Sequence, residues 1–357
     1  MSSVAPEPPA GILDLPVLKT PIPTKPTPMA DWDPAFVQRR KCVEEKILKL
    51  SNGRQLAYFT EGNPKDPAVL CLHSLGMSKT QYLFKDPVPG VFLIAVDRQG
   101  HGNSSPYPAG SRVVCKFSDH LPEYVELLDS LGVDKFYVIG SSMGASWTIA
   151  IAAGVPDRCL GAAPLSAMPD PWREGMTPAL RKPLCPEGFT GLLSMGDSSC
   201  MGSMVRKIMS GLFSFVKDRS VDPGLGKAYN MYFKYNSPNS KKFAPDFDFM
   251  DSDPFCVSAM LDARLYGGNC ANYGVVEQIR IFGKQGWGVD PANIKCPCFI
   301  YHPELDAEIP QASNEHHHRN IPGSELIVWP GLGHSTIVYK APEIILALVQ
   351  GKAATPN

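Results

Sequence analysis

Short apolar runs recur along the chain and are separated by segments whose apolar residues have helical spacing. Five of these runs occupy residues 68–72, 91–96, 136–139, 298–301 and 326–329. A run that is apolar on both faces is typical of a strand covered on both sides, as in a parallel sheet. The pattern therefore predicts a mostly parallel sheet that contains these five strands.

Helices are predicted between the strands. One helix should follow Ser118, which can cap its first turn, and should end at Gly132. Its apolar face would consist of Leu121, Val125, Leu128 and Leu131. Two more helices are expected at residues 143–153 and 342–349.

Strand and helix patterns alternate from residue 68 to 166 and again from 295 to 350. This alternation predicts an α/β fold with a doubly wound sheet. Ahead of it, two alternating apolar and polar runs flank Asn52-Gly53, a dipeptide that favours tight hairpin turns. A β-hairpin is therefore expected before the first parallel strand.

Composition changes along the chain suggest four segments. Residues 1–40 begin with a proline-dense stretch and are predicted to form an extended N-terminal tail. Residues 168–288 lack clean strand runs and hold most of the thirteen methionines, so we expect an inserted helical cap there. The α/β core would then comprise residues 41–167 and 289–357.

Charge and cysteine content exclude several classes of function. The 34 Lys and Arg nearly balance the 35 Asp and Glu among 357 residues, which gives no electrostatic reason to expect a nucleic-acid partner. No apolar run is long enough for an integral membrane span. The ten cysteines include no CxxC pair, so we interpret them as buried thiols of a reducing compartment rather than as metal ligands. A cytoplasmic location is expected, and targeting to an organelle by the tail stays open as an alternative.

A G-x-S-x-G motif spans residues 140–144, between a predicted strand and a predicted helix. In this context the motif forms a sharp turn that exposes a nucleophilic serine. The middle position assigns Ser142 as the nucleophile, while Ser141 occupies the first variable position.

A serine hydroxyl needs a base, and the base needs a carboxylate that orients it. His334 follows the last predicted strand between Gly333 and Ser335 and is the best candidate for the base. Asp306, just beyond the strand at 298–301, is the preferred acid. The alternative acids are Glu304, Glu308 and Asp290.

Backbone N–H groups must stabilise the oxyanion of a tetrahedral intermediate. Met143, directly after the nucleophile, is expected to supply one of them. The loop after the strand at 68–72 should supply the other, from Leu75 or from its neighbour Ser74.

Two further groups are interpreted as solvent-facing. His316, His317 and His318 point about 100° apart on a helix and so do not suit one metal ion. The acidic run at 246–253 lacks the glycine and the final Glu of an EF-hand loop and is expected to be a solvated loop.

Taken together, these motifs resemble those of the α/β-hydrolase fold superfamily, in its capped serine-hydrolase branch of esterases and lipases. The likeness covers about residues 45–350 and rests on segments 73–76, 97–104, 140–144, 303–306 and 333–334. The chain departs from the family pattern where Ser74 replaces a glycine of the oxyanion loop.

These residues predict hydrolysis of a carboxylic ester through an acyl-serine, with no cofactor and no metal. The methionine-rich and aromatic cap suggests a hydrophobic small molecule or lipid as the ester. The alternatives are a C–C bond hydrolase, a lyase or an acyltransferase with the same three residues, or a non-catalytic small-ligand receptor on this fold. Binding of a protein partner by the proline-rich tail is a further alternative.

Overall fold

The computed structural model describes residues 32–105, 116–185, 245–246, 248, 252–260, 262–263 and 286–356. Most of the predicted tail (1–40) and of the predicted cap (168–288) lies outside these residues. The described part of the insertion includes the short helix α4 (Pro178–Arg181) and helical residues 254–260.

One eight-stranded sheet forms the centre of the described structure, in the order β1-β2-β4-β3-β5-β6-β7-β8. Its strands are β1 (Lys46–Lys49), β2 (Gln55–Glu61), β3 (Ala68–Leu72), β4 (Phe92–Val96), β5 (Phe136–Ser141), β6 (Cys159–Leu165), β7 (Phe299–Pro303) and β8 (Glu325–Trp329). The pairs β1–β2 and β2–β4 are antiparallel, and every other pair is parallel. The predicted mostly parallel sheet is therefore confirmed.

The predicted hairpin joins β1 to β2. Lys49 pairs with Gln55, and the amide of Leu50 donates to the carbonyl of Arg54 across the turn. Gly53 supplies the positive φ of 79° that such a turn requires.

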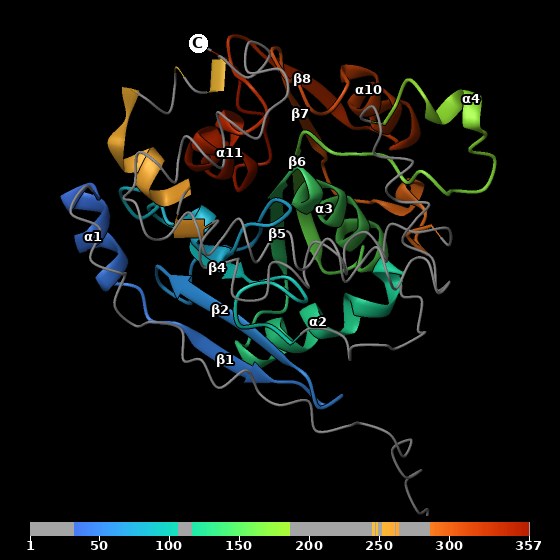
Figure 1. Ribbon diagram of the computed structural model, residues 1–357. Coiled ribbons are helices and arrows are strands. Elements are labelled where there is room, and N and C mark those ends of the chain that lie inside the picture. The colour runs from blue at the N-terminus through green and yellow to red at the C-terminus, as the bar shows by residue number, and fades with distance from the viewer. Residues whose placement is uncertain are drawn as a thin grey trace, which may run out of the picture.

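Alternation of side chains along β3 explains why its sequence is apolar throughout. Leu70 and Leu72 enter the core on one face of the sheet, and Val69 and Cys71 enter the core on the other. All four side chains are buried. Figure 1 shows α2 and α3 on one side of the sheet and α1 and α11 on the other, which confirms the doubly wound arrangement.

The main helices are α1 (Pro34–Lys41), α2 (Leu121–Ser130), α3 (Met143–Gly154), α10 (Gln311–Asn320) and α11 (Ala341–Leu348). Ser118 does not cap α2 as predicted, because a 3-10 turn over Phe117–His120 precedes that helix. The predicted end is correct: Gly132 has φ 70°, and Val133 donates to the carbonyl of Leu128.

The predicted extended tail is wrong for residues 34–40, which belong to α1. Asp33 caps this helix through the amide of Phe36 at 2.9 Å. The buried ring of Phe36 packs 5.5 Å from the ring of Phe255, so the helix is anchored against the end of the insertion.

The three consecutive histidines lie on α10, but their prediction as a solvated face is wrong for His317. That side chain is buried, its ring stacks 5.9 Å from the ring of Trp287, and its Nε2 lies 3.0 Å from the carbonyl of Met168. Burial lowers its pKa to about 3. Among the described residues, no helix combines the length and apolar character needed to cross a bilayer.

Candidate active site

Ser142 lies at the turn between β5 and α3, where its backbone adopts φ 56° and ψ −119°. A positive φ is strained for a residue other than glycine, and such strain is concentrated at functional sites. The amide of Ser142 donates to the carbonyl of Leu165 at 2.8 Å, and its carbonyl accepts from Ala145 at 2.9 Å. The turn thereby holds a partly exposed serine at the carboxyl end of a central strand.

Two glycines allow this turn to form because the backbones around them approach closely. A Cβ atom on Gly144 would lie 2.0 Å from the carbonyl oxygen of Leu72, and one on Gly140 would lie 2.3 Å from the carbonyl oxygen of Gly144. The motif therefore needs glycine at both ends for reasons of space.

Asp306 and His334 come from the loops that follow β7 and β8. These strands are paired, with Pro303 opposite Trp329, so their following loops start side by side. The amide of Leu305 donates to the carbonyl of Leu332 at 2.9 Å and joins the two loops. Residues 28 positions apart are thus brought into contact, with Nδ1 of His334 2.9 Å from Oδ2 of Asp306.

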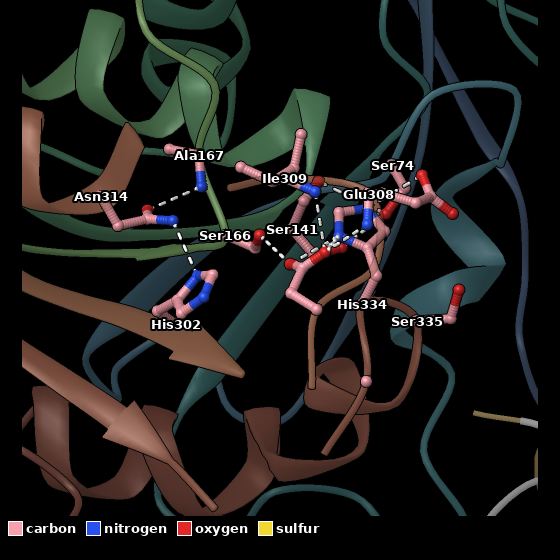
Figure 2. A network of polar contacts seen from close by, with 12 residues as sticks. Ser74, Ser141, Ser166, Ala167, His302, Glu308, Ile309, Asn314, His334 and Ser335 are labelled. Atoms are coloured by element: carbon pink, nitrogen blue, oxygen red, sulfur yellow. Dashed lines mark hydrogen bonds and ion pairs between the residues drawn. The ribbon is translucent and has the colours of Figure 1, made fainter. Parts of the chain in front are cut away.

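The carboxylate of Asp306 is surrounded by donors and has no exposed surface. Its Oδ1 accepts the amides of Glu308 and Ile309, both at 2.8 Å, and its Oδ2 accepts the hydroxyl of Ser166. Figure 2 shows this network around His334. Burial raises the pKa of a carboxyl, but His334, Ser166 and the amides overcome it and hold the pKa of Asp306 below its usual value.

His334 experiences the opposite shift. Burial alone lowers the pKa of an imidazole, but the negative charges of Asp306 and Glu308, the hydrogen bond that His334 donates to Asp306 and the charge of Asp246 raise the pKa of His334 to about 10. The directions at Asp306 and His334 agree, since each group stabilises the charged form of the other.

The two ring nitrogens of His334 have different neighbours. Nδ1 contacts Asp306, whereas Nε2 faces the half-exposed carboxylate of Glu308 at 3.5 Å. In the described part of the chain, no hydrogen bond links His334 to Ser142. The structure therefore brings two of the three sequence-predicted side chains into contact and places the third at the same edge of the sheet.

The loop after β3 carries the two candidate oxyanion donors. The amide of Ser74 donates to Oε1 of Gln81 at 2.7 Å, so this N–H is already engaged. The Ser74 hydroxyl lies 2.6 Å from that of Ser141 and also accepts from Nε2 of Gln81 at 3.0 Å. Gln81 thus fixes the loop that contains Leu75. Met143 is the first residue of α3, where an amide has no partner within its own helix.

Sequence reasoning missed Ser166, which follows β6. This residue has a positive φ of 56°, its amide donates to the carbonyl of Tyr301 at 2.8 Å, and its hydroxyl donates to Asp306. A small polar residue at the end of a strand next to β7 is the signal that could have identified it.

Asp246 was also missed, and its prediction as part of a solvated loop is wrong. Only 2% of its surface is exposed. Its Oδ1 accepts hydrogen bonds from the residues that directly follow His334. Within the described ranges, no group of three or more His, Cys, Asp or Glu side chains is arranged to hold a metal ion.

Solved structures share this fold over nearly their full length. The enol-lactonase from Burkholderia xenovorans LB400 matches with a TM-score of 0.55 at 14% identity, over 85% of this chain and 100% of its own. A thermophilic esterase from Thermogutta terrifontis matches with a TM-score of 0.53 at 17% identity, over 86% of this chain and 97% of its own. At these identities the likeness shows the fold alone.

Curated relatives match over shorter segments. A 2-succinyl-6-hydroxy-2,4-cyclohexadiene-1-carboxylate synthase candidate of Bacillus subtilis is 31% identical over 112 residues, which are 31% of this chain and 40% of that protein. Epoxide hydrolase B of Mycobacterium tuberculosis is 31% identical over 107 residues, 28% of each chain. The chain thus spans less than half the length of these relatives.

A family comparison covers far more of the sequence. The profile of the "Alpha/beta hydrolase family" matches residues 69–348, which include most of β3, the Ser142 turn, Asp306 and His334. The sheet order, the strained serine turn and the paired loops after β7 and β8 agree with that match, and the chain belongs to the alpha/beta hydrolase family.

Proposed function

We propose that this protein is a serine hydrolase that cleaves a carboxylic ester of a hydrophobic small molecule or lipid through an acyl-serine intermediate. In this proposal Ser142 is the nucleophile, His334 is the general base and Asp306 orients the imidazole. The amides of Met143 and Leu75 stabilise the oxyanion. The amide of Ser74 is the alternative to that of Leu75. No cofactor or metal enters the proposed reaction.

The observation that carries the proposal is the strained backbone of Ser142. A serine with φ 56° between a parallel strand and a helix is held in a costly conformation, and such strain is concentrated at functional sites. Ser142 is partly exposed, and the buried His334–Asp306 pair lies at the same edge of the sheet.

The proposed reaction has two steps. His334 accepts the proton of Ser142 as its oxygen attacks the ester carbonyl, and the same proton passes to the alcohol that leaves. Water then attacks the acyl-serine while His334 accepts a proton from that water. His334 finally donates this proton to the Ser142 oxygen as the carboxylic acid is released. Asp306 stays ionised throughout and stabilises the imidazolium.

Nε2 of His334 must approach Ser142 for this reaction, although it faces Glu308 in the structure. Catalytic hydrogen bonds are commonly long or misaligned without substrate and tighten when substrate binds. We therefore expect the half-exposed Glu308 side chain to give way to Ser142 and the ester.

A mainly apolar pocket lies next to the oxyanion loop, and its lining includes none of Ser142, Asp306 and His334. It has a volume of about 390 Å³ and is lined mainly by residues 83–89 together with Phe255, Cys256, Ala259, Met260, Tyr339, Pro342 and Leu346. Gln81, which fixes the oxyanion loop through Ser74, also lines it. An apolar group bound here would therefore touch the residue that positions the loop.

The test combines a panel of p-nitrophenyl esters of increasing acyl length with a fluorophosphonate probe. Wild-type protein should hydrolyse the esters, and Ser142→Ala should lose nearly all turnover and all labelling. Ser141→Ala is the matched control, since it removes the neighbouring hydroxyl and should still be labelled. Full ester turnover by Ser142→Ala would overturn the proposal.

The rival functions give different outcomes in the same assay. Turnover of thioesters or of vinylogous diketones but not of esters would favour acyl transfer or C–C bond cleavage. Binding of a ligand without turnover or labelling would favour a receptor. A strained serine at the same edge of the sheet as a buried His–Asp pair favours an enzyme over the receptor alternative.

The proposal also places the enzyme in the cytoplasm. The seven described cysteines are all free thiols, as a reducing compartment would keep them. Fractionation of cells that express the tagged full chain would test this location.

A further inference from the structure

Asp246 belongs to the insertion, yet its carboxylate lies beneath the loop that carries His334. Its Oδ1 accepts three hydrogen bonds: from the amide of Ser335 at 3.0 Å, from the amide of Thr336 at 2.9 Å and from the Thr336 hydroxyl at 3.0 Å. Burial raises the pKa of Asp246, and the three donors that converge on one oxygen, together with the charge of His334, oppose this rise by stabilising the ionised carboxylate.

A second set of contacts connects the loop of residues 333–336 to the same carboxylate. The amide of Gly333 donates to the Thr336 hydroxyl at 2.9 Å, and that hydroxyl donates to Asp246. A Cβ atom on Gly333 would lie 2.4 to 2.5 Å from the carboxylate of Asp246. Asp246 therefore contacts the chain on both sides of His334. It packs closely against Gly333 before the histidine, and it accepts hydrogen bonds from Ser335 and Thr336 after it.

We propose that Asp246 is a positioning residue for the base, which holds the 333–336 loop so that His334 faces Asp306. This inference rests on the proposed function only in that it takes His334 to be the general base. The consequence is that the insertion, which supplies Asp246, is coupled directly to the reacting histidine.

Four titratable groups face His334. Asp306 and Glu308 come from the loop after β7, His302 comes from β7 itself, and Asp246 comes from the insertion. His302 is buried, and burial lowers its pKa, so it adds no positive charge near neutral pH. The charge of Asp246 adds to those of Asp306 and Glu308 in raising the pKa of His334.

Asp246→Asn separates charge from hydrogen bonding. The amide oxygen of Asn can accept the same three donors, so the loop should keep its shape while the negative charge is lost. We expect the imidazole of His334 to titrate lower by about 0.5 to 1 pH unit, and the acidic limb of kcat/KM to move by the same amount. Asp248→Asn is the matched control, because Asp248 is an exposed member of the same acidic run.

Asp246→Ala and Gly333→Ala each disturb the contact between Asp246 and the 333–336 loop. The first removes the carboxylate, and the second adds a methyl group where the carboxylate lies. Both should lower kcat by about tenfold or more with little change in KM, because the base is misplaced while substrate contacts stay intact. Asp248→Asn should retain wild-type kcat. Unfolding midpoints of all variants would show which of them remain folded under assay conditions.

The closing experiment follows the His334 ring by NMR titration in wild type, Asp246→Asn and Asp248→Asn, with His334→Ala to assign the signal. A lower titration midpoint in Asp246→Asn alone supports the proposal. An unchanged midpoint in Asp246→Asn, or wild-type kcat in folded Asp246→Ala, overturns it. Because the titration needs no turnover, a protein without ester activity or probe labelling would refute the proposed function and leave this inference to stand or fall separately.

Discussion

Ser166 donates its hydroxyl to Oδ2 of Asp306, the same oxygen that lies 2.9 Å from Nδ1 of His334. The two residues are 140 positions apart and follow the neighbouring strands β6 and β7. Ser166 has a positive φ of 56°, as does Ser142. In the described part of the chain these are the two non-glycine residues with positive φ, and both lie at the candidate site.

Ser166→Ala should weaken the site by removing a donor from a buried carboxylate. A hydrogen bond to a charged group contributes about 1.5 to 3 kcal/mol, so we expect kcat/KM to fall by roughly 10-fold or more. Ser166→Gly removes the same hydroxyl but relieves the strained φ. Both variants should lose similar activity, while the glycine variant should unfold at higher urea concentration than the alanine variant. Wild-type kcat/KM in both would show that the contact has no role in catalysis.

The pH dependence of ester hydrolysis follows from the pKa of His334. The base must be neutral to accept the proton of Ser142, so activity should rise as the imidazolium loses its proton. Because neighbouring carboxylates raise the pKa of His334 to about 10, the acidic limb should lie well above the usual imidazole value of 6.5. The check is kcat/KM for a neutral ester across the alkaline range. A limb at or below the usual value would contradict this prediction.

Glu308→Gln should move that limb toward lower pH. The substitution removes one negative charge that faces Nε2 of His334 at 3.5 Å, and the protonated imidazole loses that stabilisation. Since 47% of the Glu308 side chain is exposed, added salt should reduce the difference between variant and wild type. Glu343→Gln is a control of similar exposure, at 42%, on α11. Equal limbs in wild type and Glu308→Gln at low salt would contradict the prediction.

The parallel strands that sequence reasoning found are those with uninterrupted apolar runs. β3 and β4 are buried on both faces, so nearly every residue in them is apolar and the run is visible without the fold. β6 is equally central, but Gly161 and Pro164 interrupt its run and hide it. Ser118 failed as a helix cap because tertiary packing of Phe117 against Trp147 favours a 3-10 turn ahead of α2.

Residues of the site could be predicted where adjacent residues in the sequence determine their environment, and not where a distant segment does. Ser142 is recognisable from five consecutive residues, because the turn itself demands glycine at each end. Asp246 stands in an acidic run that looks solvated, and only its contact with a loop 89 positions away buries it. No periodicity or composition encodes such a contact. The contact of Asp306 with Nδ1 of His334 is consistent with its choice over Glu304, Glu308 and Asp290, and Glu308 lies 3.5 Å from Nε2 of the same imidazole.

Gly144→Ala should destabilise the protein because no neighbouring atom can yield to the added methyl group. The new Cβ would lie 2.0 Å from the carbonyl oxygen of Leu72 and 2.7 Å from that of His73, and both are backbone atoms of the central sheet and its following loop. Overpacking of this kind costs about 1 to 3 kcal/mol, and we expect the upper end here because backbone must shift. Gly90→Ala serves as the control: it has φ 68° but no atom within 4 Å of its Cβ position, so it should cost only about 1 kcal/mol of left-handed strain. Urea unfolding of both variants gives the comparison. A Gly144→Ala protein as stable as wild type would mean that β3 and α3 are not packed as closely as the structure shows.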